Sequence, residues 1–114
     1  MIIYERGVIA MARKTMETLT EAMFYVLMAL KFRPMCGIEI ASTIDTLTDD
    51  RVNIGPATLY TVLGRFEKEG YIEEIEVSGR KRTYQITQTG LNAYREELDR
   101  LNRCLLDAQK LERS

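Results

Sequence analysis

The chain has 114 residues, 46% of them hydrophobic, and this length accommodates a single domain with one small core. Its formal net charge is −1, which excludes a uniformly basic nucleic-acid-binding surface, so any contact with nucleic acid must use a local cluster of cations. The absence of histidine excludes a catalytic imidazole and a histidine-bearing metal site.

The remaining composition argues against enzyme, metal and membrane classes. Cys36 and Cys104 are far apart and match no metal-ligand spacing. Most lone cysteines of this kind act as small hydrophobic residues, and the alternative is a redox switch. No apolar run approaches the ~18 residues of a membrane span, and no secretion signal pattern is present. We therefore expect a cytoplasmic protein with no metal, no cofactor and no catalytic site.

Residues 1–17 are expected to form an N-terminal extension. Their apolar positions are interrupted by Gly7 and show no helical period. The alternatives are an arm that packs on a partner subunit and a basic tail, with Arg13 and Lys14, that contacts phosphate.

A first helix is predicted from Thr18 to the residues before Pro34. Thr18 and Glu21 fit a capping box, and Pro34 prevents the helix from continuing. The stretch between them is too apolar for a helix with one solvated side. It is expected to bury one face in its own domain and another against a partner or ligand.

A second helix is predicted from about Gly37 to residue 47, where apolar residues recur at helical spacing. The sequence Thr-Asp-Asp at residues 48–50 is expected to end it. Residues 51–54 alternate in hydropathy and could form a short strand that pairs with a later hairpin.

A third helix is predicted from Pro56, which suits a first helical position, to the stop signal at Gly70. Its apolar stripe consists of Leu59, Val62, Leu63 and Phe66, and its polar stripe consists of Thr58, Thr61, Arg65 and Lys68. Gly64 inside this helix is unfavourable by about 1 kcal/mol relative to alanine.

A β-hairpin follows, with strands predicted over residues 71–77 and 82–86. Its tip carries the consecutive cations Arg80, Lys81 and Arg82. Taken alone, such a tip is explained by protection of a sheet edge against pairing with other chains.

A last helix is predicted after Thr87, which suits an N-cap. Its apolar residues step alternately by three and four, as in a coiled coil, and include Leu91, Tyr94, Leu98, Leu101 and Leu105. A narrow apolar seam on a charged helix needs another helix to cover it, and a twofold homodimer is the simplest solution. The first helix of the other subunit is the alternative cover.

A helix followed by a hairpin with a basic tip is the layout of a winged helix-turn-helix, in which one helix enters the major groove and the wing contacts phosphates. Arg65 is the candidate for a guanine edge or a phosphate, and Lys68 for phosphate only. Thr58 and Thr61 can bond to phosphate or base edges, and Tyr60 can present its hydroxyl to the DNA backbone. An ordinary solvated face explains Arg65 and Lys68 when they are taken alone, but the helix and the wing together favour duplex DNA.

The sequence resembles the PadR-like family of transcriptional regulators over about residues 18–103. The resemblance rests on Gly55-Pro-Ala-Thr-Leu-Tyr60, on Glu69-Gly-Tyr-Ile72, and on Arg82-Thr-Tyr-Gln-Ile-Thr87 with Gly90. This resemblance implies a dimeric winged-helix repressor that releases DNA when a small molecule binds. With one helix after the wing, the chain resembles the short subgroup of the family. The resemblance also implies that Thr58, Tyr60 and Arg65 belong to the recognition helix, and residues 80–82 to the wing.

The chain departs from the family in having no tryptophan, so it cannot stack a flat effector on that residue at a dimer interface. The candidates for a small apolar or aromatic effector are Phe24, Tyr25, Met28 and Phe32, for which ordinary dimer core is the alternative role.

The resulting prediction is a mainly α protein with a small β-hairpin. It comprises the extension at 1–17, a winged helix-turn-helix at 18–87 and a C-terminal dimerisation helix at 88–114. The predicted function is a sequence-specific DNA-binding regulator, acting as a dimeric, effector-relieved repressor on a palindromic operator. The alternative is a winged-helix protein-interaction module without specific DNA binding.

Overall fold

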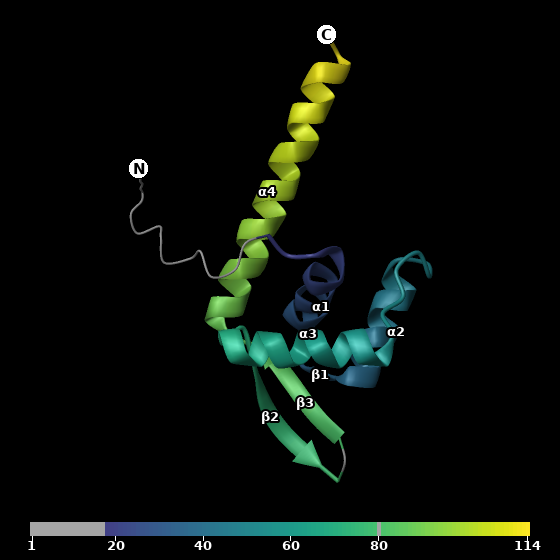
Figure 1. The fold of residues 1–114 in the computed structure, drawn as a ribbon, viewed down its shortest axis with the longest axis vertical. Coiled ribbons are helices and arrows are strands. Elements are labelled where there is room, and N and C mark those ends of the chain that lie inside the picture. Colours follow the sequence, from purple (N-terminus) through teal and green to yellow (C-terminus); the bar gives the residue numbers. More distant parts are fainter. Residues whose placement is uncertain (1–17, 80) are drawn as a thin grey trace.

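The computed structural model describes residues 18–79 and 81–114, which form four helices and a small antiparallel sheet (Figure 1). This arrangement confirms the predicted mainly helical winged-helix architecture. The predicted extension at 1–17 lies outside the described residues, and so does Arg80. The elements in chain order are α1 (Glu21–Phe32), β1 (Met35–Cys36), α2 (Gly37–Leu47), α3 (Pro56–Glu69), β2 (Ile72–Ser78), β3 (Lys81–Ile86) and α4 (Gln88–Glu112).

The first helix begins later than predicted, because its N-cap is Thr20 and not Thr18. The Thr20 hydroxyl accepts a hydrogen bond of 3.2 Å from the backbone N–H of Met23. Leu19 and Phe24 are both buried in the core, at the two positions of a hydrophobic staple. Burial of Leu19 therefore fixes where the chain enters α1, and the predicted capping box of Thr18 with Glu21 is wrong.

The third strand of the sheet is β1 and not the predicted segment 51–54. Met35 pairs with Tyr84 and Cys36 with Thr83, which places β3 at the centre of the order β1-β3-β2. Residues 51–54 form a loop instead. Its backbone is held by Thr48, whose hydroxyl accepts from Val52 N–H at 3.1 Å and donates to the carbonyls of Ile44 and Val52. Hydrogen bonds to the Thr48 side chain, and not a strand pairing, hold residues 51–54, so the prediction of a short strand there is wrong.

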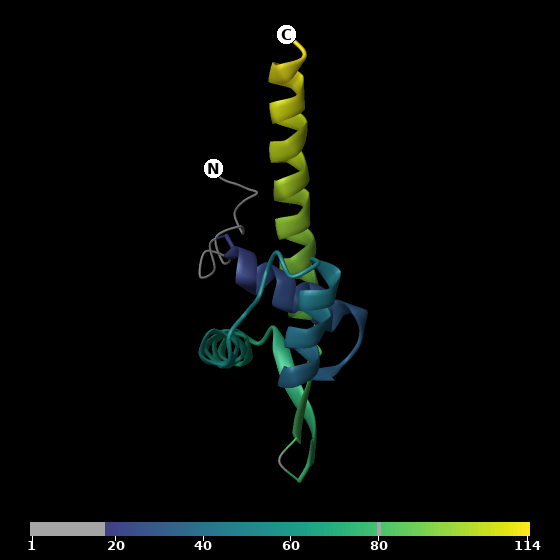
Figure 2. The same cartoon turned by 90° about the vertical axis from the view of Figure 1, so that its right-hand side faces the viewer.

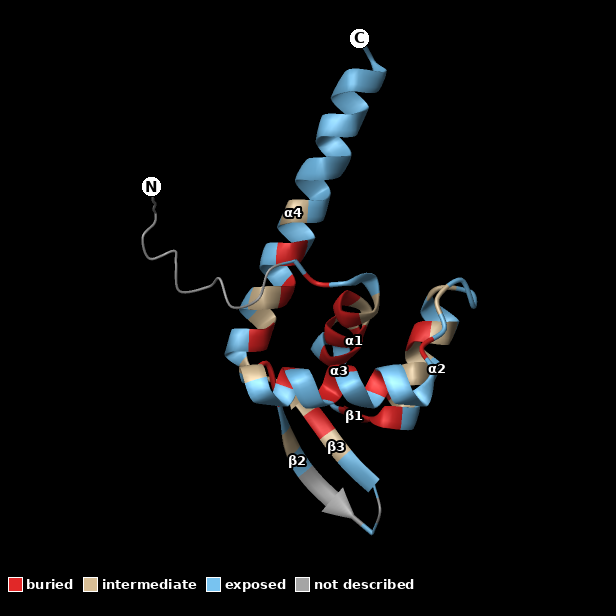
Figure 3. Cartoon of the chain, in the orientation of Figure 1, coloured by how far each residue is buried: buried red, intermediate tan, exposed pale blue. Residues whose placement is uncertain are grey.

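The core lies between α1, α3 and the sheet, and α1 is its central element (Figure 3). Val26 and Leu27 are fully buried, and Leu30 is 2% exposed. The helix contacts α2, α3, α4 and β3 of its own chain. The expectation that a second subunit or a ligand must cover one of its faces is therefore wrong for most of α1, because the elements of one chain already surround it.

The last helix is seated on Tyr71, the residue after the C-cap of α3. Thr87 caps α4, as predicted, by accepting a bond of 3.1 Å from Gly90 N–H. A Cβ on Gly90 would clash with the backbone carbonyl oxygen of Tyr71, at 2.1 Å, and would lie 2.9 Å from Ile86 Cγ1. The same Tyr71 carbonyl accepts from Thr87 N–H at 2.9 Å. The missing side chain of Gly90 therefore permits the close approach on which the position of α4 depends.

A matched pair of glycine substitutions tests this seat. Gly90→Ala is expected to lower the free energy of unfolding by about 1–3 kcal/mol, because backbone atoms cannot yield to the new methyl group. Gly64→Ala is the control, since a Cβ there meets nothing within 4 Å, and it is expected to stabilise α3 by about 0.5–1 kcal/mol. Urea denaturation followed by circular dichroism measures both values, and equal effects at the two sites would contradict the seat.

Candidate nucleic-acid interface

The exposed face of α3 carries the polar stripe predicted from the sequence. Pro56 is the first residue of the helix after the N-cap Gly55, and Gly70 ends it with a left-handed φ of 77°. Leu59, Val62, Leu63 and Phe66 are buried, as predicted, so the opposite stripe faces outward. The exposed residues Thr58, Thr61, Arg65 and Lys68 lie on that stripe.

A shallow hollow runs along this face and is lined by Tyr60, Thr61, Gly64, Arg65, Lys68 and Glu69. Gly64 supplies part of its floor, and no atom lies within 4 Å of the position of a Cβ there. The Thr61 hydroxyl donates to the Ala57 carbonyl of the same helix at 2.9 Å. Thr61 therefore presents its methyl group and a remaining oxygen lone pair, rather than a free donor, to a ligand in the hollow.

Tyr60 lies across the start of α2. A Cβ on Gly37, the first residue of α2, would be 2.5 Å from the Tyr60 hydroxyl and 3.0 Å from the carbon that carries it. The Tyr60 side chain is 54% exposed in this position. Gly37 thus leaves room for a tyrosine that keeps its hydroxyl at the surface, beside the exposed stripe of α3.

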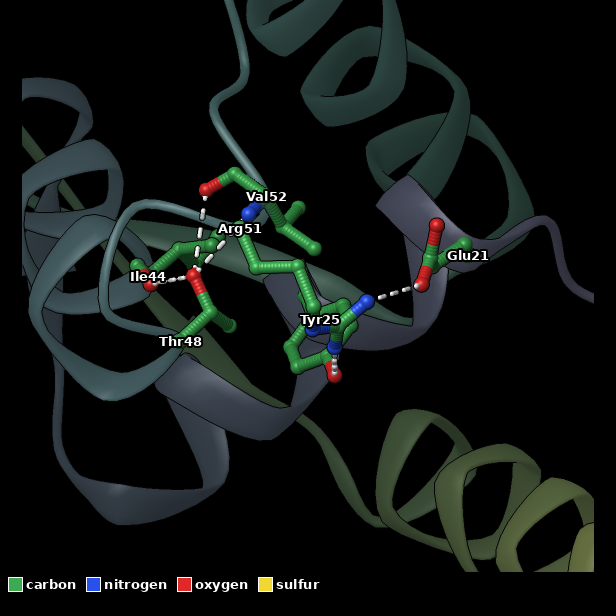
Figure 4. A network of polar contacts seen from close by, with 6 residues as sticks. All are labelled: Glu21, Tyr25, Ile44, Thr48, Arg51 and Val52. Carbon is green, nitrogen blue, oxygen red and sulfur yellow. Dashed lines mark hydrogen bonds and ion pairs between the residues drawn. The ribbon is translucent and has the colours of Figure 1, made fainter.

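The loop before α3 is fixed by a network that the sequence analysis missed (Figure 4). Arg51 donates to the Tyr25 hydroxyl at 2.8 Å and to the Glu21 carboxylate at 3.4 Å, so it ties the loop to α1. The bond to Glu21, followed by the interaction with Tyr25, raises the pKa of Arg51. Asn53 donates to Asp45 of α2 at 2.8 Å. The entry to α3 is therefore held from both neighbouring helices. The signal in the sequence was a cation placed directly after the acidic residues Asp49 and Asp50.

The cations of the wing are not equivalent. Arg82 and Tyr84 lie on one face of β3, whereas Lys81 lies on the other, because side chains alternate along a strand. Tyr84 is 2% exposed and marks the face that meets the core, and burial raises its pKa. Figure 2 shows α3 end-on beside this hairpin, which projects beyond it. Arg82 thus lies on the side of the wing that faces α3.

The four residues predicted for an effector pocket differ in their surroundings. Phe24 is buried and stacks on Tyr94 with ring centroids 5.3 Å apart. Tyr25 is engaged with Arg51, and Phe32 is 77% exposed at the end of α1. Met28 is half-buried against the core. Phe24 is therefore a core residue, and only the other three reach the surface.

The predicted dimer stripe divides into two parts along α4 (Figure 3). Tyr94 is buried under α1 of its own chain, which corrects its assignment to a surface between subunits. Leu91 is half-buried. Leu98, Leu101 and Leu105 are 46%, 39% and 55% exposed and line a shallow groove with Arg95, Asp99 and Asn102. Only this second part is open to a partner.

The remaining classes of site gain no support from the described residues. Within 18–79 and 81–114, no three histidine, cysteine or acidic side chains are grouped so that they could hold a metal ion. Cys36 is buried and Cys104 is exposed, and both are free thiols. Among the helices that the structure describes, none is long and apolar enough to cross a membrane.

Comparison with known proteins identifies the family. Residues 26–96 match the family model described as "Transcriptional regulator PadR-like family". A transcriptional regulator from Clostridium thermocellum superposes with a TM-score of 0.70 at 29% identity, over 77% of this chain and 89% of that one. RosR of H. salinarum superposes with a TM-score of 0.65 at 26% identity, over 90% and 88% of the two chains.

A curated protein of Lysinibacillus sphaericus, described only as uncharacterized, is 38% identical over 66 residues. The match covers 54% of this chain and 60% of that protein. The chain therefore matches less than two thirds of the length of this relative.

The contact between Tyr60 and Gly37 can be tested by adding a methyl group at residue 37. Gly37→Ala is expected to displace the Tyr60 ring, since the flexible end of an exposed side chain moves more easily than the backbone of α2. Spectra of protein labelled with ¹³C-tyrosine should show the Tyr60 resonances shifted, with those of Tyr84 and Tyr94 unchanged. Loss of a peak in Tyr60→Phe assigns the signal. The unfolding free energy should change by less than about 0.5 kcal/mol, and an unmoved Tyr60 peak in folded protein would refute the contact.

Proposed function

The chain belongs to the PadR-like family of transcriptional regulators, and from this premise we propose that it is a homodimeric repressor that binds a palindromic DNA operator. The observation that carries the proposal is the exposed polar stripe of α3 standing beside a projecting wing. The helix would enter the major groove, and the wing would lie along the adjacent backbone. In this proposal residues 18–87 bind DNA and residues 88–114 join two copies.

Each candidate residue has a separate task on the DNA. Arg65 contacts the edge of a guanine or a phosphate, and its guanidinium can bond to two acceptors of that base. Thr58 contacts phosphate or a base edge, and Tyr60 presents its hydroxyl to the DNA backbone. Thr61, whose hydroxyl proton is engaged by Ala57, contacts a base edge, and Lys68 contacts phosphate. Lys81, with its neighbour in sequence Arg80, contacts the DNA backbone beside the wing, and Arg82 is a third candidate whose ion pair with Glu74 competes with that contact. Contacts of the wing with phosphate add affinity without adding information about sequence.

The exposed C-terminal half of α4 supports the proposal of a homodimer. All residues from 101 to 114 are exposed, and the leucines of the groove repeat on one side of the helix. A continuous 25-residue helix is about 37 Å long, so its outer half would be poorly supported as a monomer. Pairing of two such helices would cover the leucines and set the two copies of α3 about 34 Å apart, one turn of DNA.

Relief of repression by a small apolar or aromatic molecule belongs to the same proposal. Tyr25, Met28 and Phe32 form an apolar edge on α1, and α1 packs against the buried half of α4. A molecule that binds this edge beside a partner subunit would change how α4 meets its copy. The distance between the two DNA-binding helices would change with it.

Substitution of Arg65 tests the DNA-binding face. Arg65→Ala is expected to weaken binding to the preferred sequence by about 1–3 kcal/mol and to relax the preference at one base pair. Lys68→Ala is the matched control, and it should weaken all sequences alike and reduce the salt slope by about 1. The preferred sequence is first selected from a random duplex pool, and fluorescence anisotropy gives the affinities. Retention of both affinity and preference in Arg65→Ala would remove Arg65 from the interface.

Substitution of Leu101 tests the dimer. Leu101→Glu is expected to shift the protein to monomer, because a carboxylate in the paired seam would lose its water without gaining a partner. Lys110→Gln is the control, since it makes the same change of net charge on the opposite side of the helix. Light scattering measures the mass of each variant. A wild-type monomer at working concentrations, or a Leu101→Glu dimer, would overturn the proposed pairing.

A further inference from the structure

The wing carries an ion pair that the DNA-binding role of Arg82 does not explain. The Nε and Nη2 atoms of Arg82 lie 3.1 Å and 2.7 Å from one carboxylate oxygen of Glu74. Both bonds converge on a single acceptor, so the guanidinium is held in one orientation. The hydrogen bond from Arg82 keeps the pKa of Glu74 below its ordinary value. The pair therefore persists at neutral pH and is lost only as the pH falls through that depressed pKa.

The ion pair lies on the side of the hairpin that faces α3. Glu74 is directly opposite Tyr84 in the sheet, and Arg82 is two residues from Tyr84 on the same strand. All three side chains therefore share one face of the sheet. The charge of Glu67 on α3 also contributes to raising the pKa of Arg82, after Glu74 and Tyr84. Arg82 is thus held against the Glu74 carboxylate, on the face of the sheet that also carries Tyr84.

This placement matters because the sequence-independent affinity for DNA comes from cations that neutralise phosphates. A cation that is already neutralised by a carboxylate releases no counterion when it meets a phosphate. The carboxylate itself repels the backbone. With a formal net charge of −1, the chain has no general excess of cations to compensate for one that is masked.

We propose that Glu74 masks Arg82 from the phosphates of DNA and thereby limits the sequence-independent affinity of the protein. The inference rests on the proposed function, since it assigns to Glu74 the control of a DNA contact made by the same wing. Restraint of this kind is useful to a regulator, because non-cognate sites in a genome vastly outnumber the operator. Glu74 is a positioning residue that acts through Arg82 and touches no base.

The experiment measures binding to a mixed-sequence duplex as a function of salt, using the full chain. Glu74→Gln keeps the size of the side chain and removes its charge, which releases Arg82 for one phosphate. The slope of log affinity against log salt is expected to become steeper by about 0.9, a further factor of about three between 50 and 200 mM salt. The affinity at low salt is expected to rise about threefold.

The wing offers a matched control on the same strand. Glu73 lies on the opposite face of β2 and accepts a bond of 2.8 Å from Gln85, not from a cation. Glu73→Gln changes the net charge by the same amount and leaves the Arg82 pair intact, so its slope should equal that of the wild type. The double variant Glu74→Gln with Arg82→Gln should also return to the wild-type slope. Thermal unfolding checks that each variant is folded.

Each other outcome overturns the inference. An unchanged slope in Glu74→Gln, or weaker binding, would mean that Glu74 does not mask Arg82. An equal gain in Glu73→Gln would reduce the effect to net charge, and a gain that survives removal of Arg82 would exclude this arginine as its cause. If the wild type and all variants fail to bind any duplex at low salt, the proposed function fails as well. Wild-type binding with an unaltered Glu74→Gln overturns the masking alone.

Discussion

One junction fixes the three parts of this molecule relative to one another. The chain leaves α3 through Gly70, and Tyr71 N–H returns to the Phe66 carbonyl at 2.8 Å. Thr87, at the end of the hairpin, donates its hydroxyl to the Gly70 carbonyl at 2.6 Å and its N–H to the Tyr71 carbonyl. Both ends of the wing are therefore tied to the C-terminus of α3. Because Gly90 rests on the same carbonyl, α4 begins at this point too.

The opposite end of α3 is positioned by different means. Gly55 offers no side-chain cap, and the loop before it is held by the bonds of Arg51 to α1 and of Asn53 to α2. The helix α3 is thus fixed at its C-terminus by backbone bonds, and at its N-terminus by these exposed side-chain bonds together with the part-buried bonds between Thr48 and Val52. The exposed bonds are individually weak, since water and salt compete for them.

The sequence predicted the elements whose signals are local and missed those decided by distant contacts. Pro56, Gly70 and Thr87 mark helix ends by backbone chemistry that needs no partner, so α3 and the start of α4 were predicted correctly. Thr18 and Thr20 are both competent caps, and the burial of Leu19 decides between them. The two residues of β1 form a strand only because β3 passes beside them. The repeat of apolar residues along α4 likewise does not indicate whether the same chain or a second copy covers it. Tyr94, one residue of this repeat, is buried in the core of its own chain. The DNA-contacting and dimer residues that remain are still predictions, since family membership confirms a transcriptional regulator and not their individual roles.

The division of α4 links the proposed dimer to the proposed DNA contact. Its first turns are part of the core, where Tyr94 stacks on Phe24, and its last turns carry the exposed leucines. The helix is continuous across the boundary, where Glu97 is buried beside Arg100 and paired with it. A rigid helix transmits any rotation at the seam to the junction at Tyr71, where the wing and α3 are attached. A small change in how two copies of α4 cross would therefore be amplified into a change of spacing between the DNA-binding faces, because the wing, α3 and α4 share one anchor.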